Sequence, residues 1–318
     1  MAKIKSGSNH ADLNINVDEN QEWTDEELKS LKKDFFESLD TNALDLFNAW
    51  SDKTDHCSLK ISSYFQAYAE QLHSYRGNKC TLVEIGVMEG GSLLAWKEWL
   101  GKDARVIGID INPEVKEFEK QGVEIVIGNQ ADPIFWDKFF NENRDIDIII
   151  DDGGHQYFQQ AITFFCVLFH AKKKMRFFVE DTYTSFMSNF KGQNTETFVA
   201  LMKQVVDNLY LKQIFSKKGT SHWKKDVDLE IVKAYQKIQS LSFCPGLISM
   251  TIDPRKGLIP LYLYNTSRQT KRRDHRLSGD IAGLKFTWPD PVNPREEIFR
   301  GSILSEKKLM VDISRKNK

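Results

Sequence analysis

The chain has 318 residues and a formal net charge of −1, so its overall charge favours neither nucleic acid nor an anionic membrane surface as a partner. Apolar residues make up 41% of the chain, which is enough for a sizeable core. No apolar run reaches the ~18 residues of a membrane-spanning helix, and the polar N-terminal stretch is unlike a signal peptide. The four cysteines form no CxxC pair, which argues against a zinc site or a disulfide framework. We therefore expect a cytoplasmic protein with no nucleic-acid partner and no membrane span.

The N-terminal part of the chain predicts a polar segment followed by helices. Thr24 and Glu27 have the spacing of a capping box, which predicts the start of an amphipathic helix with apolar positions at Leu28, Leu31, Phe35 and Leu39. A second helical pattern contains Tyr64, Ala67, Tyr68 and Leu72. We expect residues 1–45 to precede the main domain as a polar segment plus one amphipathic helix.

From residue 81 onward, short apolar runs alternate with helical patterns. The runs that predict strands are Thr81–Val87, Arg105–Ile111, Val123–Ile127, Ile146–Ile150 and Phe177–Val179. The helical patterns between them include Ser92–Leu100, Pro133–Asn141 and Tyr157–His170. Strands that are apolar on both faces and separated by helices indicate an α/β protein with a parallel sheet and right-handed crossovers.

The pattern changes near the C-terminal end. Leu247–Ile252 and Leu258–Tyr264 are strand-like, and residues 253–257 between them contain Pro and Gly, which predicts an antiparallel hairpin. We therefore expect one main domain over residues 46–265. Within it, the Lys- and Ser-rich residues 212–246 are a candidate substrate-facing insertion, and residues 266–318 form a C-terminal extension.

A glycine-rich turn follows the first predicted strand. Gly86, Gly90 and Gly91 let the backbone approach a ligand, and Glu84 lies two residues before the first of them. The spacing is not the G-x-G-x-x-G of a dinucleotide site. It suits S-adenosylmethionine (SAM), whose amino-acid end carries an ammonium and a carboxylate but no phosphate. A tight turn without a ligand is the alternative.

Polar residues also end the second and third predicted strands. Asp110 could accept hydrogen bonds from the ribose hydroxyls of an adenosine, whether in SAM or in NAD. Gln130, beside Asn129, could contact the adenine edge. For Asp132, capping of the helix that starts at Pro133 is an equally good interpretation.

Acidic residues gather at the ends of the fourth and fifth predicted strands. Asp151 and Asp152 follow one apolar run, and Glu180 and Asp181 follow the next. Carboxylates brought together at one sheet edge repel each other unless a cation or a buried proton intervenes. Oxygen ligands favour Mg²⁺, with Mn²⁺ or Ca²⁺ possible. Because side chains alternate along a strand, which of Asp151 and Asp152 faces the metal stays open. His155 could act as general base, with a capping role at a helix start as its alternative.

Residues from about 52 to 187 resemble the metal-dependent sugar O-methyltransferases of macrolide and related pathways, including macrocin-type enzymes. Some relatives in this family carry the name cephalosporin hydroxylase. Asp52-Lys53, His56 and Tyr64 are similar to the family's segment that closes over the active site. The other matching segments are Val83–Val87, Gly91–Leu93 with Trp96, Gly108–Ile111, Gly128–Gln130, Asp151–His155 and Glu180–Ser185.

The resemblance implies a fold, an activity and a set of site residues. The fold is the Rossmann-like class I methyltransferase sheet, seven-stranded and mostly parallel, with a closing antiparallel hairpin and helices on both faces. The implied activity is Mg²⁺-assisted methyl transfer from SAM to a hydroxyl of a sugar or glycosylated acceptor. Asp152, Glu180 and Asp181 would bind the metal, with His155 as general base and Asp152 catalytic. The implied SAM-binding residues are Glu84, Gly86, Gly91, Ser92, Asp110, Gln130 and Asp151.

Other functions remain open from the sequence. The acceptor could be a catechol-like or other small diol, and aromatic pocket residues would favour it over a sugar. A hydroxylase or other oxidoreductase, or an inactive binding protein on the same fold, are further alternatives. Homo-oligomerisation is possible.

Overall fold

The computed structural model describes residues 24–53, 55–191, 196–214 and 234–255. The chain divides into two compact units, Met1–Asp40 and Thr41–Lys318. In the first unit, α1 (Asp25–Ser38) begins after Thr24, whose hydroxyl accepts a hydrogen bond from the Glu27 N–H. The Glu27 carboxylate in turn accepts from the Thr24 N–H at 2.8 Å. The predicted capping box is therefore confirmed.

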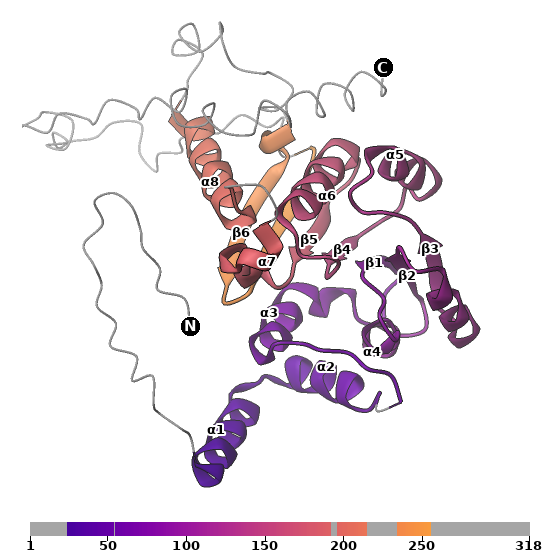
Figure 1. Ribbon diagram of the computed structural model, residues 1–318, viewed down its shortest axis with the longest axis vertical. Helices are drawn as coiled ribbons and strands as arrows, with labels where there is room; N and C mark the ends of the chain where they lie inside the picture. The colour runs from indigo at the N-terminus through magenta and orange to yellow at the C-terminus, as the bar shows by residue number, and fades with distance from the viewer. Residues whose placement is uncertain (1–23, 54, 192–195, 215–233, 256–318) are drawn as a thin grey trace, which may run out of the picture. The chain divides into compact units, whose positions relative to one another are not determined.

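The second unit contains a seven-stranded sheet in the order β3-β2-β1-β4-β5-β7-β6 (Figure 1). Its first five strands in that order are parallel, whereas β7 is antiparallel to both β5 and β6. This confirms the predicted sheet, mostly parallel with a closing antiparallel pair. The strands are β1 (Cys80–Ile85), β2 (Ala104–Asp110), β3 (Glu124–Ile127), β4 (Ile148–Asp151), β5 (Met175–Val179), β6 (Ile238–Cys244) and β7 (Leu247–Ile252).

Helices cover both faces of the sheet. Figure 1 shows α2, α3 and α4 on one side and α5, α6 and α8 on the other. No helix in the described ranges is both long and apolar enough to cross a membrane. The helices are α2 (Thr41–Ser51), α3 (Ser62–Leu72), α4 (Gly91–Leu100), α5 (Pro133–Glu142), α6 (Tyr157–His170), α7 (Ser188–Lys191) and α8 (Phe198–Ile214), with shorter 3₁₀ turns η1 (His73–Tyr75), η2 (Pro113–Gln121) and η3 (Thr182–Phe186).

The central strands fix the backbone on which the site stands. Every residue of β1, β4 and β7 is buried, because these strands have neighbours on both edges and helices on both faces. Hydrogen bonding between neighbouring strands continues past their carboxyl ends: the Asp152 N–H donates to the Ile85 carbonyl at 3.0 Å, and the Glu180 N–H donates to the Asp151 carbonyl at 2.9 Å. The backbone of the residues that follow β4 and β5 is therefore held by hydrogen bonds to the neighbouring strands.

The composition of the closing hairpin corrects one prediction. Leu247–Ile252 is a strand as expected, but its partner is Ile238–Cys244, which precedes it across the Pro245-Gly246 turn. The sequence pattern missed this strand because β6 lies at the edge of the sheet and exposes much of its length, so it shows no continuous apolar run. Residues 238–244 therefore belong to the sheet and not to the predicted insertion 212–246. The other predicted strand, Leu258–Tyr264, and the extension 266–318 lie outside the described residues.

Gly86 shows why the turn after β1 requires glycine. Its φ is +91°, and a Cβ placed there would lie 2.1 Å from the Asp152 carbonyl oxygen. The turn after β1 and the chain after β4 thus approach each other more closely than any side chain would allow.

We predict that Gly86→Ala destabilises the protein far more than Gly77→Ala does. Both glycines have positive φ, so each alanine costs about 1 kcal/mol of backbone strain. At Gly77 an added Cβ meets no atom within 4 Å. At Gly86 the clash with Asp152 adds about 1–3 kcal/mol. Urea unfolding of the two variants measures both losses, and equal losses would contradict the close approach.

Candidate active site

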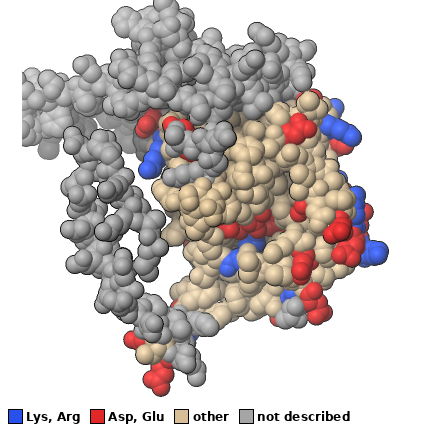
Figure 2. Space-filling view, in the orientation of Figure 1, with Lys and Arg blue, Asp and Glu red and all other residues tan. Residues whose placement is uncertain are grey.

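A pocket of about 450 Å³ opens at the carboxyl ends of the parallel strands. Four of the seven predicted SAM-binding residues line it: Gly86, Ser92, Asp110 and Gln130. The predicted residues Asp152, His155 and Asp181 line it as well. In Figure 2, acidic side chains gather near the middle of the face shown, with basic side chains beside them. The structure thus brings residues from five strand ends to one pocket, as a switch point in an open α/β sheet predicts.

The other three predicted SAM-binding residues are buried beside this pocket. The Glu84 carboxylate accepts hydrogen bonds from the Ser92 hydroxyl at 2.7 Å and from the Trp96 indole N–H at 3.3 Å. Gly91 lies so close to the segment before α3 that a Cβ would meet the His56 carbonyl oxygen at 2.7 Å. Both residues therefore hold the pocket wall in place.

The Asp110 carboxylate is fixed by two backbone amides. One oxygen accepts from the Val87 N–H and the other from the Asn112 N–H, each at 2.8 Å. Asp110 therefore ties the turn after β1 to the end of β2. The Asp132 side chain accepts from the Ile134 N–H at 2.9 Å, so its helix-capping interpretation is confirmed.

Gln130 holds the loop that follows β4. The side-chain Nε2 of Gln130 donates to Asp151 Oδ1 at 2.9 Å, and the side-chain Oε1 accepts from the Gly154 N–H at 2.8 Å. Asp151 itself is fully buried, and its Oδ2 has no hydrogen-bond partner among the described residues. Burial raises the pKa of Asp151 to about 6, although the bond from Gln130 opposes this shift.

The acidic side chains fall into two groups that share Asp152. On one side, Nε2 of His155 lies 4.0 Å from Asp152 Oδ1 and 3.8 Å from Asp181 Oδ2. On the other side, Glu84, Asp152 and Glu180 converge. The three predicted metal ligands are therefore not in one group, because Glu180 and Asp181, although adjacent in sequence, contribute to different ones. The sequence left open which of Asp151 and Asp152 faces this site, and the structure places Asp152 there.

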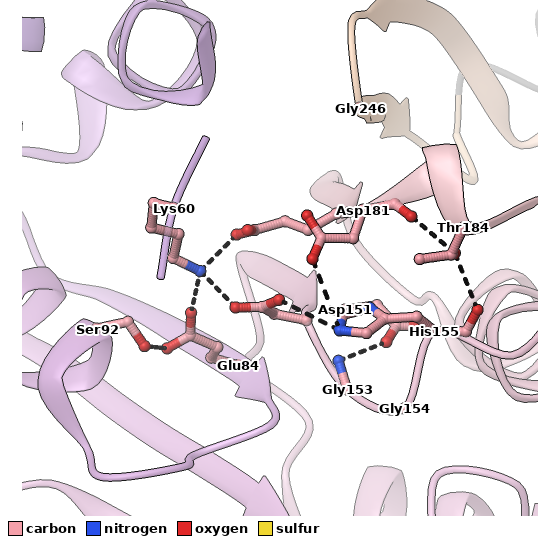
Figure 3. A network of polar contacts seen from close by, with 12 residues as sticks. Lys60, Glu84, Ser92, Asp151, Gly153, Gly154, His155, Asp181, Thr184 and Gly246 are labelled. Atoms are coloured by element: carbon pink, nitrogen blue, oxygen red, sulfur yellow. Dashed lines mark hydrogen bonds and ion pairs between the residues drawn. The ribbon is translucent and has the colours of Figure 1, made fainter. Parts of the chain in front are cut away.

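Lys60 occupies the centre of the second group (Figure 3). Its Nζ lies 2.6 Å from Asp152 Oδ2, 2.7 Å from Glu180 Oε1 and 3.2 Å from Glu84 Oε1. Burial disfavours its charged form, but the three carboxylates outweigh this effect and raise the pKa of Lys60 well above its ordinary value. We did not predict this residue from the sequence. The available signal was its spacing of four residues before Tyr64, together with the excess of acids that needed a buried cation.

Two tyrosines of α3 bind the carboxylates after β5. The Tyr64 hydroxyl lies 2.9 Å from Asp181 Oδ1 and accepts from the Asp181 N–H at 3.0 Å. The Tyr68 hydroxyl donates to Glu180 Oε1 at 2.6 Å. Burial raises the pKa of Glu180, and the neighbouring charge of Asp152 raises it further.

Backbone strain is concentrated at this pocket. Among the described residues, the only three non-glycine residues with positive φ are Met88 (51°), His155 (56°) and Asp181 (53°). All three line the pocket. Each such conformation costs about 1–3 kcal/mol and persists only where surrounding contacts enforce it. For His155 one such contact is the Thr184 hydroxyl, which donates to its carbonyl oxygen at 3.1 Å.

Comparisons with known proteins agree with this geometry. No protein-family model matches the chain. The 8-demethyl-8-α-L-rhamnosyl tetracenomycin-C 2′-O-methyltransferase of Streptomyces olivaceus is 32% identical over 198 residues, which cover 59% of this chain and 49% of the relative. Demethylmacrocin O-methyltransferase of Streptomyces fradiae is 26% identical over 166 residues, which cover 48% of this chain and 42% of the relative. This chain thus spans less than half the length of these curated relatives.

Among solved structures, the MycE methyltransferase of the mycinamycin biosynthetic pathway, in complex with Mg and SAH, has a similar fold. The TM-score is 0.54 at 22% sequence identity, and the match covers 66% of this chain and 53% of that chain. The chain therefore has the Rossmann-like fold of class I methyltransferases and is similar in sequence to the macrolide and sugar O-methyltransferases.

Proposed function

We propose that the chain is a SAM-dependent O-methyltransferase that acts, with a divalent cation, on a sugar hydroxyl of a glycosylated small molecule. The observation that carries this proposal is the convergence of Asp152, His155 and Asp181 at a pocket whose walls follow the strand ends of a class I methyltransferase fold. The sugar O-methyltransferases among the relatives support the same assignment.

The pocket suits SAM as the methyl donor. Gly86 has no side chain, so the backbone of this turn can contact SAM directly. Asp110 lies at the end of β2, where an adenosine ribose would bind. Gln130 and Ser92 add polar groups to the same wall. SAM bound in this pocket would supply the methyl group that is transferred to the acceptor oxygen.

The residues around His155 fit a divalent cation such as Mg²⁺, Mn²⁺ or Ca²⁺. Asp152 and Asp181 each turn one carboxylate oxygen toward the same space, and hard cations prefer oxygen ligands. Glu180 lies in the neighbouring group, where Lys60 and Tyr68 both contact its Oε1. A cation bound there would lower the pKa of an acceptor hydroxyl and neutralise the alkoxide charge.

His155 is placed to take the proton from that hydroxyl. The Nε2 of a neutral imidazole can accept a proton, and here Nε2 faces the space between Asp152 and Asp181. The Nε2 atom lies 4.0 Å from Asp152 Oδ1 and 3.8 Å from Asp181 Oδ2, beside the proposed cation position.

The pocket lining favours a sugar acceptor over a catechol. Among the described residues, no Phe, Tyr or Trp lines the pocket. Sugar hydroxyls in this pocket would meet the polar side chains of Asp152, His155 and Asp181.

We predict that the purified protein binds SAM and not NAD. The reason is the turn sequence, which offers no G-x-G-x-x-G cradle for a pyrophosphate. Calorimetric titration with each cofactor, with and without Mg²⁺, provides the measurement. Binding of NAD without SAM would refute the methyltransferase assignment.

We predict that Asp181→Asn lowers Mg²⁺-dependent methyl transfer by about 10²-fold or more, because the substitution removes one charge that the cation would bind. SAM affinity should stay unchanged, because the residues proposed to bind SAM, among them Gly86, Asp110 and Gln130, are not altered. The measurement is SAH formation with rhamnosylated and other glycosylated acceptors, with Mg²⁺ or with EDTA.

Asp132→Asn is the matched control for this experiment. Asp132 caps α5 outside the pocket, and asparagine caps helices as well as aspartate does. Its turnover should equal that of the unaltered protein. Full activity of Asp181→Asn would remove Asp181 from the cation site.

A further inference from the structure

Part of the segment that joins α2 to α3 lies directly against the start of α4. A Cβ added at Gly91 would lie 2.7 Å from the His56 carbonyl oxygen and 3.1 Å from the Cβ of Ser58. We call residues His56–Leu59 the strap. Two residues of the strap, Ser58 and Leu59, line the pocket proposed to bind SAM. The strap is therefore one wall of that pocket.

Glu89 joins the strap to the turn that follows β1. Its Oε2 accepts a hydrogen bond from the Cys57 N–H at 2.9 Å, and its main-chain carbonyl oxygen lies 3.0 Å from Nδ1 of His56. Because a carbonyl oxygen can only accept, the second bond requires a proton on Nδ1. Glu89 lies between Val83–Val87 and Gly91–Leu93, the segments that resemble the family, so the resemblance implies no role for it.

Aromatic side chains hold the strap at two further points. Trp50 in α2 donates its indole N–H to the Ser58 hydroxyl at 3.1 Å. The ring of Phe118 in η2 packs edge-on against the His56 imidazole, with 5.7 Å between the ring centroids. The same ring packs on the turn, because a Cβ added at Gly90 would lie 2.9 Å from it. The strap is thus held to α2, to η2 and to the turn after β1.

Two apolar side chains that line the pocket are exposed to solvent. Leu59 of the strap is 76% exposed, and Met88 of the turn is 59% exposed. A ligand that covers these side chains removes apolar surface from water, which favours binding. The turn suits the amino-acid end of SAM, whereas Asp110 lies where the ribose would bind. The two side chains therefore stand beside the amino-acid end.

We propose that Glu89 is a positioning residue that holds the strap against the turn, so that Leu59 and Met88 cover the amino-acid half of bound SAM. This inference rests on the proposed function, because it concerns the cofactor of the same pocket. Glu89 does not line the pocket, so it acts through the strap. Without this contact the strap would leave the turn for part of the time. Cofactor affinity falls in proportion to the fraction of molecules in the binding-competent state.

Glu89→Ala is the main test, because it removes the hydrogen bond to Cys57 and leaves the pocket lining unchanged. Calorimetric titration should give an SAH affinity about 3–10-fold lower than that of the unaltered protein, at the same stoichiometry. Affinity for 5′-methylthioadenosine, which keeps the adenosine but lacks the amino-acid end, should change little. A general loss of structure would weaken both ligands. Equal losses for the two ligands would therefore overturn the proposal.

Glu89→Gln is the matched variant. The side-chain carbonyl of glutamine can still accept from the Cys57 N–H, so SAH affinity should stay close to that of the unaltered protein. If Glu89→Gln loses as much affinity as Glu89→Ala does, the charge of Glu89 and not its contact with the strap is responsible, and the positioning role is wrong.

Gly91→Ala displaces the strap without altering Glu89. Alanine is the better helix former, so α4 itself should tolerate the change. The added Cβ would force the His56 carbonyl away, and SAH affinity should fall at least as far as in Glu89→Ala. Unchanged SAH affinity in Glu89→Ala or in Gly91→Ala would overturn the positioning role and leave the proposed function standing. If the unaltered protein binds neither SAM nor SAH, the proposed function fails as well.

Discussion

The burial of Lys60 among three carboxylates is the interaction on which the site depends. Glu84, Asp152 and Glu180 come from the ends of three central strands, and Glu84 and Glu180 are buried there from the solvent that would stabilise their charge. Uncompensated, such charges would cost several kcal/mol each or would become neutral. One ammonium, supplied by the segment before α3, lets these acids remain close together beside the pocket.

The same segment links the helical layer to the chemistry. Lys60 and the two tyrosines of α3 reach the carboxylates after β4 and β5, and the hairpin turn at Gly246 packs on Tyr64. The closing hairpin therefore completes the sheet and also supports the acidic edge. A change in this turn would reach Asp181 through a single hydroxyl.

Strain follows from the same arrangement. Positive φ angles occur at the pocket in Met88, His155 and Asp181. Each of these residues lies in a tight turn at the carboxyl edge of the sheet, where the turn determines the direction of the side chain. Two of these conformations are held by backbone hydrogen bonds: the Asp181 N–H donates to the Tyr64 hydroxyl, and the His155 carbonyl accepts from the Thr184 hydroxyl. Stability is thus exchanged for fixed backbone positions of His155 and Asp181.

The sequence by itself determined the order of the five parallel strands, the acidic edge and seven of the residues that line the pocket, because buried parallel strands are apolar runs and their polar residues follow at the carboxyl ends. It missed β6, since an edge strand that is half exposed carries no such run. Only the tertiary structure separated Glu180 from Asp181 and placed Lys60 between the acids. The reason is physical: neighbouring residues after a strand can point to opposite sides, and a partner 92 residues away in sequence leaves no local pattern.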